Sequence, residues 1–301
     1  MSKSLVIINP TAGGGRAKAL WPTLEPRLKE ALGSFEIKVT EKRGEGQKIA
    51  GKTANFSRVI ACGGDGTIHE VANGLFQIDE RHRPVLGILS MGTGSDFIKS
   101  LKIPNDPFHQ VATLKQGQTR KIDVGKIEFT LKGKQEKRIF LNIVDAGLGA
   151  DVLERLHTSR RFFGRSAAYL LATLQAYRHR KCHEMEIVVD GERGWREKAL
   201  LIALANGQCF GGGMRIAPHA NLEDGLIDIT LVRDLSPTRL PLVLPALYAG
   251  KLDHLPQVTM RRGRRVEINS SFPVPLDIDG EQIGTLPLHL EVLPEALRLF
   301  S

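Results

Sequence analysis

Apolar runs alternate with helix-like stretches in the first third of the chain. Leu5–Ile8, Val59–Cys62 and Val85–Leu89 are apolar throughout, and Phe35–Val39 alternates apolar with polar residues. Continuous apolar runs are typical of strands that are buried on both faces of a sheet. Because helix-like segments separate them, the pattern predicts a parallel sheet with helices on both faces.

A leucine stripe predicts the first helix. Leucines recur every four residues from Leu20 to Leu32, as they do along one face of a helix. Pro22 and Pro26 lie inside this stretch, where proline removes a backbone donor and clashes with the preceding turn. We therefore expect the helix to start late or to have an irregular first turn.

The pattern changes near residue 120 to a series of short strands, which predicts an antiparallel β-sandwich. The expected division is an α/β domain over 1–120 and a sandwich over 121–292, with 293–301 folding back onto the first domain. Helices are expected at about 166–178 and 237–249. The expected strands are 121–129, 137–144, 185–189, 199–205, 227–232, 266–268, 275–278 and 288–292.

Charge and cysteine content narrow the class of protein. The 301 residues carry a formal net charge of +9, which favours polyanionic partners such as nucleotides, nucleic acid or an anionic membrane. The three cysteines are scattered and form no CxxC pair, which excludes a disulfide framework and a zinc site and fits a reducing cytoplasm. The apolar run at Leu5–Ile8 is too short for a signal-peptide core or a membrane span.

Three glycine-rich turns each follow an apolar strand, at Gly13–Gly15, Gly63–Thr67 and Gly92–Gly94. Parallel sheets bind ligands at the carboxyl ends of their strands, where backbone amides and helix N-termini suit phosphate oxygens. Neither the GK[ST] ending of a P-loop nor a GxGxxG fingerprint is present. One such loop would be an ordinary tight turn, but three in series, one with Asp65 between glycines, indicate a polyphosphate site.

The segment Gly63-Gly-Asp-Gly-Thr67 resembles the GGDGT signature shared by diacylglycerol, sphingosine and NAD kinases and, more remotely, by phosphofructokinases. Other segments resemble further elements of the diacylglycerol kinase family, in family order and over almost the whole chain. The layout is most similar to the short, soluble bacterial lipid kinases, which implies a phosphofructokinase- and NAD-kinase-like α/β domain and a C-terminal sandwich. The segments are Asn9–Gly13 (NPxSG), Met91–Phe97 (GTxNDF), Phe140–Gly149 (FxN with GxG), Asn221–Asp228 (DGLLD) and Leu276–Glu281 (LDGE).

The resemblance implies an ATP site in the first domain, with Mg²⁺ as cofactor. Asp65 would hold the Mg²⁺ that bridges the phosphates or orient its water ligands, and a turn-capping role is the alternative. The implied nucleotide contacts are Asn9, Gly13, Gly14, Gly15, Thr40, Gly64, Asp65, Gly66, Thr67, Ile68, His69, Glu70 and Thr93.

The resemblance also implies acidic residues that act on the acceptor. Glu281 matches the family's proton acceptor, and its alternative is a plain hairpin turn at an Asp-Gly pair. Asp279 and Asp96 are the next candidates for this base. Asp96 and Asp123 match acidic positions near the acceptor or the metal, with a helix cap and a strand-end charge as alternatives.

A second, structural Mg²⁺ site is implied at Asn221, Asp224 and Leu226, with some ligands from backbone carbonyls. The alternative for these residues is a simple Asp-Gly turn.

Three positions depart from the family pattern. Ser95 replaces the asparagine of GTxND, His69 replaces the asparagine of GGDGTxNE, and Gly14 stands where many relatives carry lysine. The departures concern the geometry of nucleotide binding and leave Asp65 and Glu281 in place.

Two basic clusters suggest peripheral contact with an anionic membrane, with a solvated surface as the alternative. Nucleic acid is not an expected partner, because the sequence contains no helix-turn-helix, zinc-finger or RNP motif. The clusters are Arg160, Arg161, Arg165, Arg178, Arg180 and Lys181, and Arg261, Arg262, Arg264 and Arg265.

The leading hypothesis is an ATP- and Mg²⁺-dependent lipid kinase that phosphorylates a hydroxyl of a membrane lipid, such as diacylglycerol or a related lipid. One alternative is an NAD kinase-like enzyme with a small-molecule acceptor. Another, favoured by Ser95, His69 and the missing lysine, is a nucleotide-binding regulator without turnover. The protein is expected in the cytoplasm, peripheral at the membrane, and a homodimer is compatible with the sequence.

Overall fold

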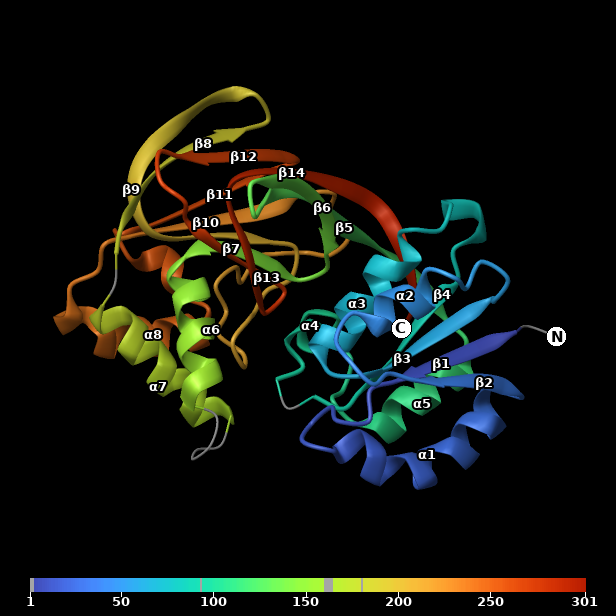
Figure 1. Cartoon of the computed structure of the whole chain (residues 1–301). Coiled ribbons are helices and arrows are strands. Elements are labelled where there is room, and N and C mark those ends of the chain that lie inside the picture. The colour runs from blue at the N-terminus through green and yellow to red at the C-terminus, as the bar shows by residue number, and fades with distance from the viewer. Residues whose placement is uncertain (1–2, 93, 160–164, 180) are drawn as a thin grey trace. The chain divides into compact units, whose positions relative to one another are not determined.

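The computed structural model describes residues 3–92, 94–159, 165–179 and 181–301 (Figure 1). Contacts divide the chain into two compact units. Unit 1 consists of the residues up to Asp123 together with Pro294–Ser301, and unit 2 is Val124–Leu293. Two strands run from one unit into the other, β5 (Thr119–Leu131) and β14 (Glu281–Phe300).

Unit 1 is built on a parallel sheet in the order β2-β1-β3-β4. The strands are β1 (Ser4–Ile8), β2 (Phe35–Val39), β3 (Arg58–Gly63) and β4 (Val85–Ser90). The end of β14 returns to this sheet and pairs with β4 in parallel, Leu299 opposite Leu86. The last residues of the chain therefore complete the sheet of unit 1.

Helices cover both faces of this sheet, as expected. Figure 1 shows α1 and α5 on one face and α2 and α3 on the other, and the members of each pair contact one another. The helices of unit 1 are α1 (Arg16–Leu32), α2 (Glu45–Ala50), α3 (Asp65–Leu75), α4 (Asp96–Ser100) and α5 (Pro107–Gln116), with a 3₁₀ turn at Glu80–His82.

The expectation of a late start for the first helix is wrong. Helix α1 begins at Arg16 and continues through Pro22 and Pro26, which are both exposed. Leu24 and Leu28 on its other face are fully buried. Prolines on the solvent side let the helix curve around the core, so packing of the leucine stripe outweighs the lost hydrogen bonds.

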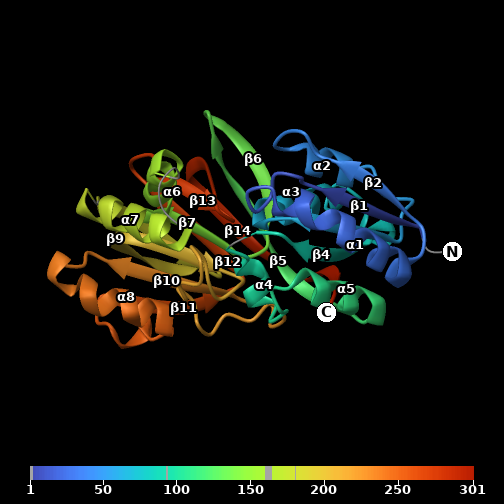
Figure 2. The ribbon, with the colours of Figure 1, turned by 90° about the horizontal axis from the view of Figure 1, so that it is seen from below.

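Unit 2 is an antiparallel, sandwich-like domain. One layer has the order β11-β10-β9-β7-β13-β14, and β9, β10 and β11 lie side by side in Figure 2. Strand β9 pairs with β8 and then with β7 and β10, while β14 pairs with β13 and then with β12, so both long strands link the two layers. The remaining strands are β6 (Lys134–Phe140), β7 (Ile143–Gly147), β8 (His183–Val189), β9 (Glu192–Ala205), β10 (Ile227–Arg233), β11 (Val258–Gly263), β12 (Arg265–Ser270) and β13 (Pro275–Ile278).

Three features of unit 2 differ from the expected elements. The single strand expected at 137–144 is two strands, because the chain bends at Leu141 and Asn142. Strand β11 and helix α6 (Leu148–Ser159) were not expected. The apolar positions of α6 recur at helical spacing. They were not recognised as a helix because they directly follow a glycine motif, which is typical of a loop. The other helices are α7 (Arg165–Arg178) and α8 (Leu240–Ala249), with 3₁₀ turns at Pro237–Arg239 and Leu252–His254.

Buried aliphatic and aromatic side chains from both layers form the core of unit 2, with Phe129 and Phe140 among the largest. Across the described residues, no helix has the length and hydropathy needed to cross a bilayer.

Candidate functional site

The first glycine loop leads from β1 into α1. Gly13, Gly14 and Gly15 all have positive φ, at 63°, 70° and 96°, a backbone region that glycine adopts without steric cost. A Cβ atom on Gly13 would lie 2.2 Å from the carbonyl oxygen of Met91, which follows β4. The first loop therefore packs directly against the third, and only glycine fits at this contact.

Asn9 connects the first loop to the second. Its Nδ2 donates to Thr67 Oγ1 over 3.1 Å, while its Oδ1 accepts from the backbone N–H and the hydroxyl of Thr11. The second and third loops also touch, because a Cβ on Gly92 would lie 3.2 Å from the Cα of Gly64. The three loops thus meet at the carboxyl edge of the sheet, as the sequence predicts.

Helix α3 begins at the centre of these loops. Gly64 is its N-cap and Asp65 its first residue, and both are partly exposed. The first backbone N–H groups of a helix have no partner within the helix and carry a partial positive charge. Together with the glycine amides they form an arrangement that suits phosphate oxygens.

Glu70 is engaged elsewhere. Its two carboxylate oxygens accept from the backbone N–H groups of Gly44 and Gly46, over 2.7 and 3.0 Å. Gly44 is the N-cap of α2, so Glu70 caps that helix from outside. These two hydrogen bonds explain why a glutamate stands at this position without any bound nucleotide. The nucleotide contact of Glu70 stays a prediction.

Other predicted nucleotide residues are buried. Ile68 and His69 lie in the interior, with 1% and 4% of their surface exposed. Thr40 is also buried, and its hydroxyl donates to the carbonyl of Ile8 over 3.3 Å. Their nucleotide contacts stay predictions, as does that of Thr93, which lies outside the described residues.

Ser95 closes the third loop with a buried hydroxyl network. It has a φ of 50°, its Oγ lies 2.7 Å from Ser90 Oγ, and it donates to the carbonyl of Gly92 over 3.1 Å. The next residue, Asp96, opens α4 and forms an ion pair with Lys99 at 3.0 Å. The N-cap residue of α4 is Ser95, so Asp96 stands one residue after the position that the capping alternative gave it, and its catalytic role stays a prediction.

Asp123 is buried at the end of unit 1. Its Oδ1 accepts from the backbone N–H of Glu295 over 2.8 Å. The carboxylate therefore holds the returning C-terminal strand, and its role near acceptor or metal stays a prediction.

The residues at α3 fit Mg²⁺ in one particular way. Among the described residues, no group of three or more His, Cys, Asp or Glu side chains could hold a metal ion. Mg²⁺ in kinase sites usually takes one or two carboxylates, with waters and substrate phosphates as its other ligands. Asp65 beside an open helix N-terminus suits that mode of binding.

The predicted second metal site has the geometry of a turn. Asn221 Oδ1 accepts from the N–H of Glu223 over 3.2 Å, and Asp224 Oδ1 accepts from the N–H of Leu226 over 3.1 Å. The other carboxylate oxygen of Asp224 lies 3.8 Å from the guanidinium of Arg262. These bonds match the turn alternative, and the metal site stays a prediction.

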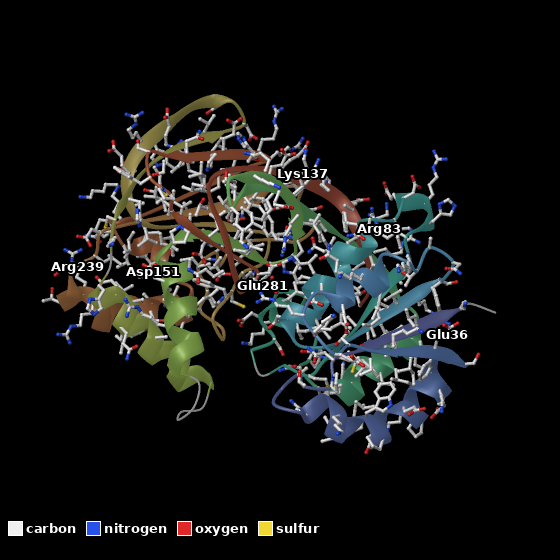
Figure 3. All side chains as sticks on the ribbon, viewed as in Figure 1. Glu36, Arg83, Lys137, Asp151, Arg239 and Glu281 are labelled. Atoms are coloured by element: carbon white, nitrogen blue, oxygen red, sulfur yellow. The ribbon has the colours of Figure 1, made fainter. Side chains whose placement is uncertain are left out.

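Glu281 stands just after the tight turn between β13 and β14 (Figure 3). Asp279 and Gly280 both have positive φ, at 50° and 84°, as a two-residue hairpin turn requires. The Glu281 side chain is 15% exposed and lies 3.5 Å from the guanidinium of Arg138. The tight turn of the hairpin alternative is therefore present, and the role of Glu281 as proton acceptor stays a prediction.

Asp279 is fully engaged with the backbone. Its carboxylate accepts from the N–H groups of Leu141, Asn142 and Ile143, over 2.7, 2.9 and 3.0 Å. This contact explains why the FxN and LDGE segments occur together, since one supplies the amides and the other the acceptor. A carboxylate held in this way is a poor candidate for the base.

Two further carboxyl groups, missed by the sequence analysis, lie beneath this turn. Asp277 of β13 stands directly opposite Asp145 of β7, and they are 4% and 1% exposed. Burial, with Asp279 and Glu281 nearby, raises the pKa of Asp277 to about 7, against the effect of the Gly280 amide. Burial first, and then Asp277 and Asp151, raise the pKa of Asp145 well above its ordinary value. The available signal was Asp145 inside the apolar run Ile143–Ala146.

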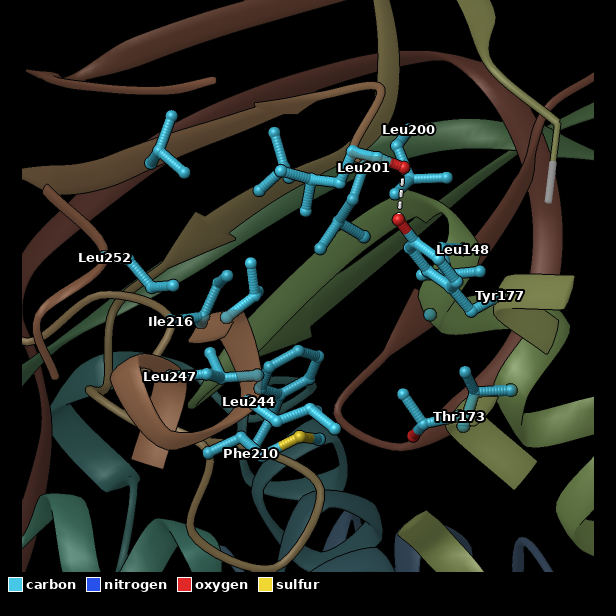
Figure 4. A pocket seen from close by; sticks show the side chains of 17 residues that line it. Leu148, Thr173, Tyr177, Leu200, Leu201, Phe210, Ile216, Leu244, Leu247 and Leu252 are labelled. Carbon is cyan, nitrogen blue, oxygen red and sulfur yellow. Dashed lines mark hydrogen bonds between the residues drawn. The ribbon is translucent and has the colours of Figure 1, made fainter. Parts of the chain in front are cut away.

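Unit 2 also contains an apolar cavity of about 90 Å³ (Figure 4). The hydroxyl of Tyr177 at its wall is already bonded to the carbonyl of Leu235. The lining residues come from α6, α7, α8, β9, β10 and the loops beside them, for example Leu148, Leu201, Phe210, Val232, Leu244 and Leu247. No sequence motif indicated this cavity, because its residues are scattered along the chain.

The basic clusters are only partly described. Arg160, Arg161 and Arg180 lie outside the described residues. In the second cluster, the Arg261 guanidinium stacks on Trp195 at 4.1 Å, and Arg262 donates to Asp228 over 3.1 Å. Half of that cluster is thus engaged within the chain, while Arg264 and Arg265 are exposed.

Comparison with known proteins gives matches over nearly the whole chain. Residues 3–127 match the diacylglycerol kinase catalytic domain, and residues 142–301 match the YegS C-terminal NAD kinase beta sandwich-like domain. A Chromohalobacter salexigens protein named "Probable lipid kinase YegS-like" is 31% identical over 280 residues, covering 91% of this chain and 86% of that protein. The chain belongs to the diacylglycerol kinase and YegS-like lipid kinase family.

Membership in this family makes the chain a lipid kinase with a catalytic domain followed by a sandwich-like domain. A Staphylococcus aureus diacylglycerol kinase is 27% identical over 301 residues, covering 99% of this chain and 92% of the relative. A crystal structure of a diacylglycerol kinase from Bacillus anthracis aligns with a TM-score of 0.75 at 23% identity, covering 99% of this chain and 96% of the other. That structural likeness supports the fold alone.

Proposed function

We propose that this lipid kinase uses Mg²⁺-bound ATP to phosphorylate a hydroxyl of a membrane lipid, with diacylglycerol or a related lipid as the acceptor. The observation that carries the proposal is the meeting of three glycine loops around the start of α3, where Asp65 is the first residue. The relatives named for diacylglycerol support the choice of acceptor.

Phosphoryl transfer depends on positioning and charge neutralisation more than on covalent help from the protein. The amides of Gly13 and Gly14 and of the first two residues of α3 would hold the phosphates, whereas the Gly15 amide already donates to the carbonyl of Thr11 over 3.2 Å. Asp65 would carry Mg²⁺, which supplies positive charge at the phosphate oxygens. Asn9 would keep the first two loops in register through its bond to Thr67.

Glu281 is the proposed proton acceptor for the lipid hydroxyl. Its carboxylate is partly exposed at the hairpin, whereas Asp279 is held by three amides and Asp277 is buried. Asp279 is also partly exposed, but three backbone amides hold its carboxylate, so Glu281 is the one of the three that we propose as the base.

The apolar cavity of unit 2 supports a lipid acceptor. Its lining is almost wholly apolar, and the hydroxyls of Tyr177 and Thr173 are its only polar side-chain groups among the described residues. An acyl chain fits such a lining, since burial of each methylene is worth about 0.8 kcal/mol. An NAD-like acceptor would need polar groups that this cavity lacks among the described residues.

The proposal includes peripheral contact with an anionic membrane from the cytoplasm. The formal net charge of +9 and the exposed Arg264 and Arg265 support it, because each basic residue near an anionic surface contributes about 1 kcal/mol.

Incubation with labelled ATP, Mg²⁺ and a total lipid extract tests the proposal. We expect a labelled phospholipid product, with none from NAD as sole acceptor, and none from either with the Asp65→Asn variant. Label in NAD would show the NAD kinase alternative to be correct. Nucleotide binding without any labelled product would favour a regulator.

A further inference from the structure

Helix α8 is a surface helix without a polar face. Its residues, Leu-Pro-Leu-Val-Leu-Pro-Ala-Leu-Tyr-Ala, include no charged side chain, and the Tyr248 hydroxyl is their only polar side-chain group. A helix at the surface of a globular protein normally turns charged and polar residues toward water. Apolar residues all round a helix indicate an apolar environment on both sides.

The inner side of α8 has such an environment within the chain. Val243, Leu244 and Leu247 line the apolar cavity, where Figure 4 shows Leu244 and Leu247 side by side. This side of the helix is explained by packing.

The outer side is apolar and exposed. Leu242 is 71% exposed and Tyr248 is 43% exposed, and Pro245 and Ala249 between and beside them are exposed too. Spacings of three and four residues place these side chains on one face of the helix. Contacts within the described chain do not cover this face.

Basic residues flank the exposed face. Arg239 precedes α8 and Lys251 follows it, both exposed, and neither forms an ion pair with any described residue. Asp253, two residues after Lys251, lies 3.9 Å from His219 and 3.8 Å from His254. An apolar helix face between cations is typical of helices that lie in the interface of an anionic membrane.

We propose that α8 is the membrane-docking element of this protein, inserting Leu242 and Tyr248 among the acyl chains of an anionic bilayer while Arg239 and Lys251 contact the headgroups. The inference rests on the proposed function, since an acceptor that stays in the bilayer requires a docked enzyme. Because its inner side lines the cavity, α8 has hydrocarbon on one side and the cavity on the other. A lipid chain passing beside this helix would remain in apolar surroundings.

The first test is flotation with vesicles of phosphatidylcholine and phosphatidylglycerol. The double variant Leu242→Glu/Tyr248→Glu should bind these vesicles at least about tenfold more weakly than the wild type. The reason is that two apolar side chains are no longer transferred from water into the bilayer. Phe272→Glu is the matched control, since Phe272 is 73% exposed but lies between β12 and β13. It should change binding by no more than about twofold. Equal losses in both variants, or none in either, would overturn the inference.

A second measurement does not depend on glutamate substitutions. In Leu242→Trp, tryptophan emission should shift to the blue and be quenched by brominated lipid when vesicles are added, whereas Phe272→Trp should show neither effect. A tryptophan at position 242 that stays in water would contradict insertion.

Activity separates this inference from the proposed function. With a short-chain, water-soluble diacylglycerol the Leu242→Glu/Tyr248→Glu variant should match the wild type, and it should lose activity only toward vesicle lipid. Absence of wild-type activity on both substrates would refute the proposed function, while flotation would still test docking. If the wild type is a dimer that the variant breaks, and vesicle binding is unchanged, α8 is a self-association surface and the docking inference is wrong.

Discussion

Neighbouring carboxylates in the hairpin between β13 and β14 have different surroundings. Asp279 accepts three backbone amides and holds Leu141–Ile143 in place. Glu281 is partly exposed beside Arg138. At the scale of single residues, the backbone therefore holds the first carboxylate, and the second is the proton acceptor that we propose.

Exchanging each carboxylate for its amide should separate these roles. Glu281→Gln should lower turnover about 10²–10⁴-fold and leave the free energy of unfolding and Mg·ATP affinity unchanged, because glutamine cannot accept the proton. Asp279→Asn should lower the free energy of unfolding by about 1.5–3 kcal/mol, since the amides lose a charged acceptor. Urea unfolding and a lipid phosphorylation assay measure both. Near-normal turnover in Glu281→Gln would show that the base is another group.

The buried pair of Asp277 and Asp145 should make stability depend on pH. The pKa of Asp277 is raised from 3.8 to about 7 in the folded state, so the folded protein binds more protons than the unfolded chain between these values. The contribution of this group is then fully present below pH 4 and is lost as the pH rises through 7. Its slope is about 1.4 kcal/mol per pH unit for one proton.

Asp277→Asn should remove this slope, because the amide is neutral at every pH. The difference in melting temperature between wild type and variant, measured from pH 4 to pH 8, isolates the effect from other carboxylates. Asp253→Asn, at an exposed site, serves as control and should show no such difference. A wild-type curve parallel to that of Asp277→Asn would mean that Asp277 is ionised throughout.

At the scale of elements, loops and helices are fixed by a few polar and steric contacts. Glu70 in α3 caps α2, Asn9 bonds to the loop before α3, and Gly13 touches the carbonyl of Met91. The glycine loops of unit 1 are thus held in place by residues that lie inside the sequence motifs themselves.

Removing the cap on α2 should affect stability. Glu70→Ala leaves two amides at the start of α2 without their acceptor and should cost about 1–3 kcal/mol of unfolding free energy. Glu36→Ala is the control, since Glu36 forms an exposed ion pair with Lys3 that contributes no more than about 1 kcal/mol. Chemical denaturation measures both, and equal small losses would show that the cap is unimportant.

Alanine at two adjacent glycines should distinguish strain from collision. Gly13 and Gly14 both have positive φ, but a Cβ on Gly14 meets nothing within 4 Å. Gly14→Ala should cost about 1–2 kcal/mol for the backbone conformation alone. Gly13→Ala should cost about 1–3 kcal/mol more, because the third loop must move. Equal losses in thermal unfolding would mean that the first and third loops are not in contact.

At the scale of the whole molecule, the sequence predicted what local pattern determines. The apolar runs predicted the parallel strands of unit 1. The glycine-rich turns that follow them predicted that the three loops lie together at one edge of the sheet. It did not predict the engagement of Asp279 by Leu141–Ile143 or the pairing of Asp145 with Asp277, because these depend on strand register between distant segments. The cavity could not be predicted for the same reason. Pro22 and Pro26 led to a wrong prediction of where α1 starts, because packing of the leucine face outweighs the low helix propensity of proline.

The return of β14 to unit 1 has a consequence for biosynthesis. Residues of β14 supply contacts to earlier parts of unit 1. The amide of Glu295 donates to Asp123, the carbonyl of Ala296 accepts from the guanidinium of Arg83 (Figure 3), and Leu299 pairs with β4. Until residues 294–301 have been synthesised, unit 1 has an open sheet edge at β4, and Asp123 and Arg83 each lack one of their hydrogen-bond partners. The two halves of the gene therefore cannot be exchanged as independent modules, and a premature stop near the end would damage the first domain to be translated.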